Sequence, residues 1–175
     1  MTAPPKYDRP DPSEFPPFYA GYVNGMPDGE ILGLMETQIG ELTRGLGAVP
    51  ESRGDFAYAP GKWTLKEVVG HVADSERVFS YRALRIGRGD QTPLPSFDEK
   101  LYVPNSGAND RTLADLLAEL QAVRASTLAL FRHMPAEAPV RKGTAGAGSI
   151  TVRALAWVIA GHAAHHYRII RERYL

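Results

Sequence analysis

The sequence predicts an all-α protein folded as a four-helix bundle. Four segments place apolar side chains at spacings of three and four residues, the period of an amphipathic helix. Helix-capping residues precede these segments, and no segment shows convincing strand alternation. A short pair of strands in the longest connection is kept as an alternative. A chain of 175 residues is long enough for one domain with a core, residues 1–175, and too short for two to be expected.

A proline-rich arm, residues 1–27, precedes the first helix. We expect it to pack its aromatic rings on the bundle without being regular throughout. The aromatic residues that interrupt the prolines are Phe15, Phe18, Tyr19 and Tyr22. The first helix should then begin at Asp28 as its N-cap and end at the glycines of residues 45–47.

The second helix is expected to begin at Thr64, because Thr64 and Glu67 have the spacing of a capping box. It should run to about Ile86, where the stretch "G-R-G-D" ends it. The connection that follows, residues 89–111, is rich in proline and longer than most loops. We therefore expect this long helix 2–3 loop to line a functional site.

The third helix is predicted for residues 112–134, with Thr112 and Asp115 repeating the capping spacing. Residues 143–149 are rich in glycine and alanine, and we interpret them as a flexible turn. The fourth helix is predicted for residues 151–174. The connections between the first three helices are too long to require simple up-and-down neighbours, so the sequence also allows a crossover topology.

Composition excludes several classes of function. The 20 basic and 20 acidic residues cancel without a block of like charge, which disfavours binding to nucleic acid or to an anionic membrane surface. The chain has no cysteine, so any metal must be bound by nitrogen and oxygen atoms. We find no signal peptide and no apolar run long enough to span a membrane, and we expect a cytoplasmic protein.

Three of the five histidines lie in the C-terminal stretch "G-H-A-A-H-H-Y-R", residues 161–168. His162 and His166 are four residues apart and so lie within about 40° of each other on a helix. This spacing allows two imidazoles to bind one metal ion. His165 lies to the other side and is a weaker candidate for the same ion.

The second helix contains a similar stretch, "G-H-V-A-D-S-E-R", which places His71 on its inward side. Unpaired imidazoles are costly to bury, so histidines on apolar faces call for a metal or a hydrogen-bond network. Three histidines from two helices would leave coordination positions open for water or substrate, as catalytic zinc sites do. The alternatives are a hydrogen-bonded core histidine for His71 and an accidental site for the pair.

Four other residues are candidates for the pocket around such a site. His165 would line it or hydrogen-bond near it, and Asp74 would accept a hydrogen bond from the second nitrogen of a ligand. Arg77 and Arg168 would bind an anionic substrate. The alternatives are a solvated carboxylate for Asp74 and surface ion pairs for the two arginines.

Three stretches of the chain together resemble the DinB/YfiT-like family of bacterial four-helix-bundle metalloproteins: "G-K-W-T-L-K-E-V-V-G-H-V-A-D-S-E-R-V", "T-P-L-P-S-F-D-E-K-L-Y-V" and "T-V-R-A-L-A-W-V-I-A-G-H-A-A-H-H-Y-R-I-I". The resemblance implies an up-down-down-up bundle with a divalent ion, often zinc or nickel, held by His71, His162 and His166. It also implies a homodimer and similarity to transferases and isomerases that use bacillithiol or mycothiol.

Three functions remain open at this point. In the first, the metal activates a low-molecular-weight thiol for transfer to an electrophile, in detoxification or a stress response. In the second, the metal activates water for hydrolysis, which also calls for a general base. No carboxylate follows the first histidine of the pair as in "H-E-x-x-H", which favours thiol transfer. The third is a non-catalytic metal-binding protein induced by stress or DNA damage.

Overall fold

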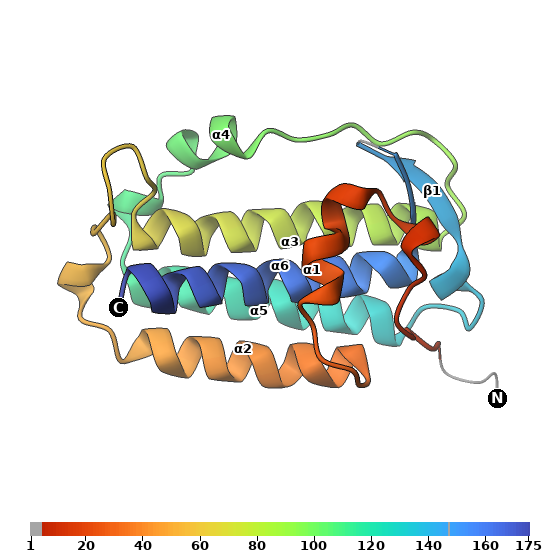
Figure 1. Ribbon diagram of the computed structural model, residues 1–175, viewed down its shortest axis with the longest axis horizontal. Coiled ribbons are helices and arrows are strands. Elements are labelled where there is room, and N and C mark those ends of the chain that lie inside the picture. Colours follow the sequence, from red (N-terminus) through yellow and green to blue (C-terminus); the bar gives the residue numbers. More distant parts are fainter. Residues whose placement is uncertain (1–4, 147) are drawn as a thin grey trace.

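The computed structural model describes residues 5–146 and 148–175, and four long helices form its body. These are α2 (Ile31–Gly47), α3 (Leu65–Gly87), α5 (Leu113–Arg132) and α6 (Val152–Arg173). They pack side by side as a bundle (Figure 1). The predicted all-α four-helix bundle is confirmed, and each long helix lies where the apolar period placed it.

The direction of the helices gives the bundle its topology. Helices α3 and α5 run in one direction, and α2 and α6 run in the other, so the order is up-down-down-up (Figure 1). The connection between the parallel helices must therefore return along the length of α3, roughly 34 Å at about 1.5 Å per residue. It does so over one side of the bundle and contains the short helix α4 (Glu99–Tyr102).

The helix starts follow the predicted capping chemistry at three of the four positions. Thr64 and Glu67 form the capping box of α3, and Thr112 and Thr151 accept backbone N–H groups at the starts of α5 and α6. The expected cap of α2 was wrong. Glu30 takes this role, and its carboxylate accepts the amides of residues 32 and 33.

Asp28 forms an ion pair with Arg9 instead of capping α2. The same Arg9 side chain donates to the carbonyls of Val23, in the short helix α1 (Ala20–Asn24), and of Met26, which follows it. Asp28 lies two residues before Glu30, the N-cap of α2.

The glycine-rich segment interpreted as a flexible turn is a β-hairpin. Strand β1 (Lys142–Ala145) pairs antiparallel with β2 (Gly148–Thr151), and Leu94 of the long connection forms a bridge to Ala145. A Cβ atom at Gly143 would lie 2.6 Å from the Ile86 side chain, so this glycine permits the hairpin to pack on α3. The strand pair considered for the long connection therefore lies elsewhere, after α5.

The N-terminal arm crosses the bundle near the start of α2 and includes the short helix α1 (Ala20–Asn24) (Figure 1). The Tyr7 hydroxyl donates to the Phe131 carbonyl, and the Trp157 indole donates to the Tyr7 carbonyl. Phe15 is buried, whereas Phe18 is 76% exposed, so only part of the aromatic arm packs as expected. Short 3-10 turns occupy Pro12–Glu14, Pro17–Tyr19, Glu51–Arg53, Val103–Asn105, Ala108–Asp110 and Ala138–Val140.

The apolar core consists of two clusters with a polar layer between them. On α6 one cluster ends at Ala160 and the other begins at Ala163, with His162 between. Buried polar side chains occupy the corresponding level on other helices, Glu76 on α3 and Arg124 on α5. We call this level the mid-bundle polar layer. None of the helices in the described ranges is both long and apolar enough to cross a membrane.

Candidate metal centre

The histidines predicted to act together do lie together, in the mid-bundle polar layer. His71 comes from α3, and His162 and His166 come from adjacent turns of α6. Each offers one ring nitrogen, and the three nitrogens all lie within 4.8 Å of one another. The Nε2 atoms of His71 and His162 face each other at 3.2 Å.

This separation fits a shared ion. Two nitrogen ligands of a tetrahedral ion with bonds of about 2.0–2.1 Å lie about 3.3–3.4 Å apart. The three residues therefore form a possible site for a divalent metal. Because imidazole nitrogens are typical ligands of zinc and nickel, the donor set also suits the ions expected from the sequence.

The histidines are held in their neutral form, which is the form that binds a metal. Burial lowers the pKa of His71 from 6.5 to about 4, and the charge of Glu99 opposes part of this shift. Burial and the neighbouring imidazoles lower the pKa of His166 to about 3 and that of His162 well below its usual value.

The surroundings of His71 fix its ring. The Ser75 hydroxyl, one helical turn away, lies 3.5 Å from Nδ1, on the opposite side of the ring from the nitrogen that faces His162. The Trp63 ring packs 4.8 Å from the His71 ring, centre to centre. A fixed ring is what a metal ligand requires, because its free nitrogen must point at the ion.

Gly161 explains why a glycine precedes His162. A Cβ atom at this position would lie 2.2 Å from the Tyr22 carbonyl oxygen, so only glycine lets the backbone of α1 pack this closely on α6. The close approach brings the Tyr22 ring to 5.4 Å from the His162 ring and 5.5 Å from the His165 ring. The N-terminal arm thereby becomes one wall of the site.

The three histidines open into a cavity of about 420 Å³. Its walls are mainly aromatic and come from the arm, α3, the long connection, the hairpin turn and α6. The long connection lines this pocket, as the sequence led us to expect. The lining residues are Phe18, Tyr19, Tyr22, Trp63, His71, Ser75, Phe79, Arg82, Ser96, Phe97, Glu99, Gly146, His162, His165 and His166.

His165 lines the pocket but lies outside the group of three. Its Nδ1 atom lies 3.4 Å from the Arg168 guanidinium, and burial together with this positive charge lowers its pKa. Arg168 itself is exposed and does not line the cavity.

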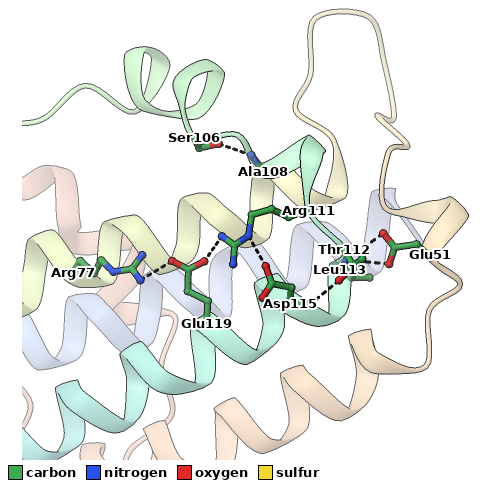
Figure 2. Close-up of polar contacts among 9 residues, drawn as sticks. All are labelled: Glu51, Arg77, Ser106, Ala108, Arg111, Thr112, Leu113, Asp115 and Glu119. Carbon is green, nitrogen blue, oxygen red and sulfur yellow. Dashed lines mark hydrogen bonds and ion pairs between the residues drawn. The ribbon is translucent and has the colours of Figure 1, made fainter.

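Asp74 and Arg77 lie on another side of α3, away from the histidines. Arg77 contacts Glu119 of α5 at 2.6 Å and Asp74 at 3.2 Å. Figure 2 shows Arg77 and Arg111 both reaching Glu119, in a chain of surface ion pairs between α3 and α5. This arrangement matches the surface alternative for Arg77.

The two carboxylate- or guanidinium-bearing residues that line the pocket, Glu99 and Arg82, were not among the sequence candidates. Glu99 belongs to the long connection, which was expected to line the site but gave no reason to select one residue. Arg82 could have been found from its spacing, because it follows His71, Ser75 and Phe79 on one face of α3 at steps of four, four and three.

A model of the DinB superfamily matches residues 34–170, a range that includes all three histidines. The chain belongs to the DinB superfamily. Membership rests on most of the chain and agrees with the family resemblance of its three motifs. The up-down-down-up bundle is thus the fold of a DinB superfamily protein.

Two known proteins give this family context. The chain is 28% identical over 102 residues to a Bacillus subtilis protein named "Putative metal-dependent hydrolase YfiT", and the match covers 58% of this chain and 57% of that protein. The alignment thus spans little more than half of the YfiT sequence. The YfiT structure, described as having an unusual four-helix bundle topology, superposes with a TM-score of 0.74 at 22% identity and covers 91% of both chains.

A mycothiol-dependent maleylpyruvate isomerase has a similar fold. It superposes with a TM-score of 0.68 at 16% identity, covering 85% of this chain and 62% of the isomerase. At these identities both structural matches show the fold alone.

Proposed function

We propose that the protein is a metal-dependent enzyme that activates the thiol of a low-molecular-weight co-substrate and transfers it to an electrophile. The observation that carries the proposal is the open group of three neutral histidines at the wall of an aromatic pocket. Three protein ligands leave coordination positions for a substrate atom. A divalent ion, zinc or nickel, would there lower the pKa of a bound thiol or water.

The residues of the chain would divide the work in the following way. His71, His162 and His166 would hold the ion, and Ser75 would keep the His71 ring in place. The aromatic side chains that line the pocket would bind the apolar part of the reactants and exclude water.

The absence of a general base beside the histidines supports thiol transfer over hydrolysis. Among the described residues, none of the three histidines has a carboxylate oxygen within 4.0 Å. A thiol with a lowered pKa loses its proton readily near neutral pH, whereas an attacking water is helped by a nearby base.

Glu99 supports hydrolysis as the second candidate. It lines the pocket, and its charge acts on His71. A movement of α4 toward the histidines would place its carboxylate near an attacking water. The name of the YfiT relative points to the same reaction class for that protein.

The test begins with metal analysis of protein purified without an affinity tag and then measures thiol consumption with a panel of electrophiles. We expect close to one divalent ion per chain and thiol transfer that is lost in His166→Ala. A metal content far below one ion per chain would overturn the proposal.

Glu99→Gln separates the two candidates. Thiol transfer should be nearly unchanged in this variant, whereas hydrolysis that uses Glu99 as its base should fall by about 10²–10⁴-fold. Activity on ester or amide panels that falls in Glu99→Gln, with no activity on any thiol, would favour the hydrolase. The expected homodimer would be measured separately by light scattering.

A further inference from the structure

Three lysine and arginine side chains are buried in the part of the chain that the structure describes, and two of them have acidic partners. Lys66 lies within 3.0 Å of two carboxylates, and Arg124 forms an ion pair with Glu76 at 2.8 Å. Arg82 is only 3% exposed, and no carboxylate of the described residues lies within 4.0 Å of it. A buried charge without a partner is costly, so Arg82 needs a reason to be retained.

The contacts of Arg82 leave part of its guanidinium available. Its Nη2 atom donates to the Pro95 carbonyl at 2.8 Å. The rings of Phe79 and Phe97 lie 5.9 and 5.7 Å from its central carbon, close enough for cation–π attraction. A guanidinium has five N–H donors, and the residues that the structure describes provide Arg82 with one hydrogen-bond acceptor, the Pro95 carbonyl.

Arg82 lines the same pocket as the histidines but at its far end. Its backbone lies about 16 Å beyond that of His71 along the α3 axis, at about 1.5 Å per residue. The Phe79 ring is packed 5.9 Å from the central carbon of Arg82 and 5.8 Å from the His162 ring. Its neighbours in the lining are Ser96 and Gly146, and a Cβ atom at Gly146 would lie 3.4 Å from Nη2. Glu99, by contrast, acts on His71 at the opposite end. The pocket therefore carries opposite charges at its two ends.

We propose that Arg82 is a specificity residue that binds a carboxylate of the substrate or thiol co-substrate, at the end of the pocket remote from the histidines. The proposal rests on the use of this pocket as the reaction site. The planar guanidinium matches a planar carboxylate through paired N–H donors. The substrate class is thus an elongated molecule with its reacting atom at one end and a carboxylate at the other.

The test compares matched thiols on protein loaded with cobalt, which reports thiolate binding through a sulfur-to-metal absorption band. Mercaptohexanoate and mercaptoundecanoate carry a carboxylate, and mercaptohexanol and mercaptoundecanol carry a hydroxyl in its place. In the wild type we expect at least one of these carboxylates to bind about ten- to a hundredfold more tightly than its alcohol. Thioglycolate should show no such advantage over mercaptoethanol, because it is too short to reach Arg82.

Variants of Arg82 then test whether this residue causes the preference for a carboxylate over a hydroxyl group. Arg82→Gln should abolish the carboxylate-to-alcohol ratio, and Arg82→Lys should keep part of it because the charge remains. Arg77→Gln is the matched control, since Arg77 lies on the same helix outside the pocket, and it should keep the wild-type ratio. A general loss of pocket shape in Arg82→Gln would weaken both ligands alike and leave the ratio unchanged.

Two results would overturn the role of Arg82: equal affinities for every matched pair in the wild type, or a preference that survives Arg82→Gln. If no thiol produces the absorption band, the thiol-transfer proposal fails, and the Arg82 proposal is judged on metal-free protein with hexanoate and hexanol. A preference for hexanoate that is lost in Arg82→Gln would then support it. No preference would overturn it.

Discussion

The mid-bundle polar layer has a closed side and an open side, and both use the same stretch of α3. On the closed side, Arg124 donates to both Glu76 oxygens at 2.8 Å, to the Met35 carbonyl at 2.9 Å and to the Gln38 side chain at 3.0 Å. Gln38 in turn donates to the Ala160 carbonyl at 2.8 Å. This network joins all four long helices, and its charges are matched.

On the open side, the polar groups face each other or the cavity. His71 and His162 meet at 3.2 Å, and among the described residues the pair has no carboxylate partner. Farther along the same pocket, Arg82 has the Pro95 carbonyl as its only hydrogen-bond partner within the described residues. The histidines and Arg82 both border the cavity, so a ligand that enters it can reach their nitrogen atoms. The comparison shows that the closed side joins the four helices through matched charges. The open side leaves polar groups at the cavity, where they can bind a metal or a substrate.

The largest effect on stability is expected when one partner of the buried ion pair on the closed side is removed. Arg124→Met would leave Glu76 buried without its partner, and we expect the free energy of unfolding to fall by about 3–5 kcal/mol. Urea unfolding followed by circular dichroism measures the change. A loss below about 1 kcal/mol would contradict a structural role for the pair.

The double variant Glu76→Leu with Arg124→Met is the control for that experiment. Because it removes both charges, it should be more stable than Arg124→Met alone. A double variant as unstable as the single one would indicate that lost packing, rather than an unpaired charge, causes the effect.

The buried histidines of the open side should make the stability of the metal-free protein depend on pH. The folded pKa of His71, about 4, lies below its unfolded value of 6.5, so between these pH values the unfolded chain binds more protons. Stability should therefore decrease as the pH falls from about 6.5 to about 4. His71→Gln should flatten this part of the melting-temperature profile, and an unchanged slope would count against buried neutral histidines.

The smallest effect is expected outside the layer. Arg77→Gln removes a surface ion pair whose arginine side chain is 47% exposed. Such pairs contribute about 0–1 kcal/mol, and the contribution decreases with added salt. Metal content should stay at the wild-type level, measured by elemental analysis. A loss of metal in this variant would show that Arg77 supports the metal site and does not only stabilise the helix surface.

The positions of the helices could be predicted because their causes are local. Apolar period and capping boxes act within one or two turns, so Thr64 with Glu67 and Thr112 with Asp115 mark real helix starts. The β-hairpin could not be predicted in the same way. Its strands depend on Ile86 and Leu94, which are distant in sequence, while its glycines favour a turn by local rules alone.

Of the candidate site, the spacing of His162 and His166 was readable because it lies within one helix. His71 was selected from a similar short stretch and from the family resemblance. Glu99 gave no comparable signal, because a single acidic residue in a loop is common at a protein surface. Arg82 shares one face of α3 with His71, Ser75 and Phe79, but this spacing alone does not show that its side chain is buried without a carboxylate. Their importance lies in burial and in the partners that surround them.

The sequence by itself determined the four helices, the family and the histidines that belong together, since each follows from short-range patterns. Only the tertiary structure decided which buried charges are matched. Arg124 and Arg82 look alike in sequence, yet packing gives one a carboxylate from a neighbouring helix and gives the other a cavity. The physical reason is that the energy of a buried charge depends on atoms brought close by folding, not on its neighbours along the chain.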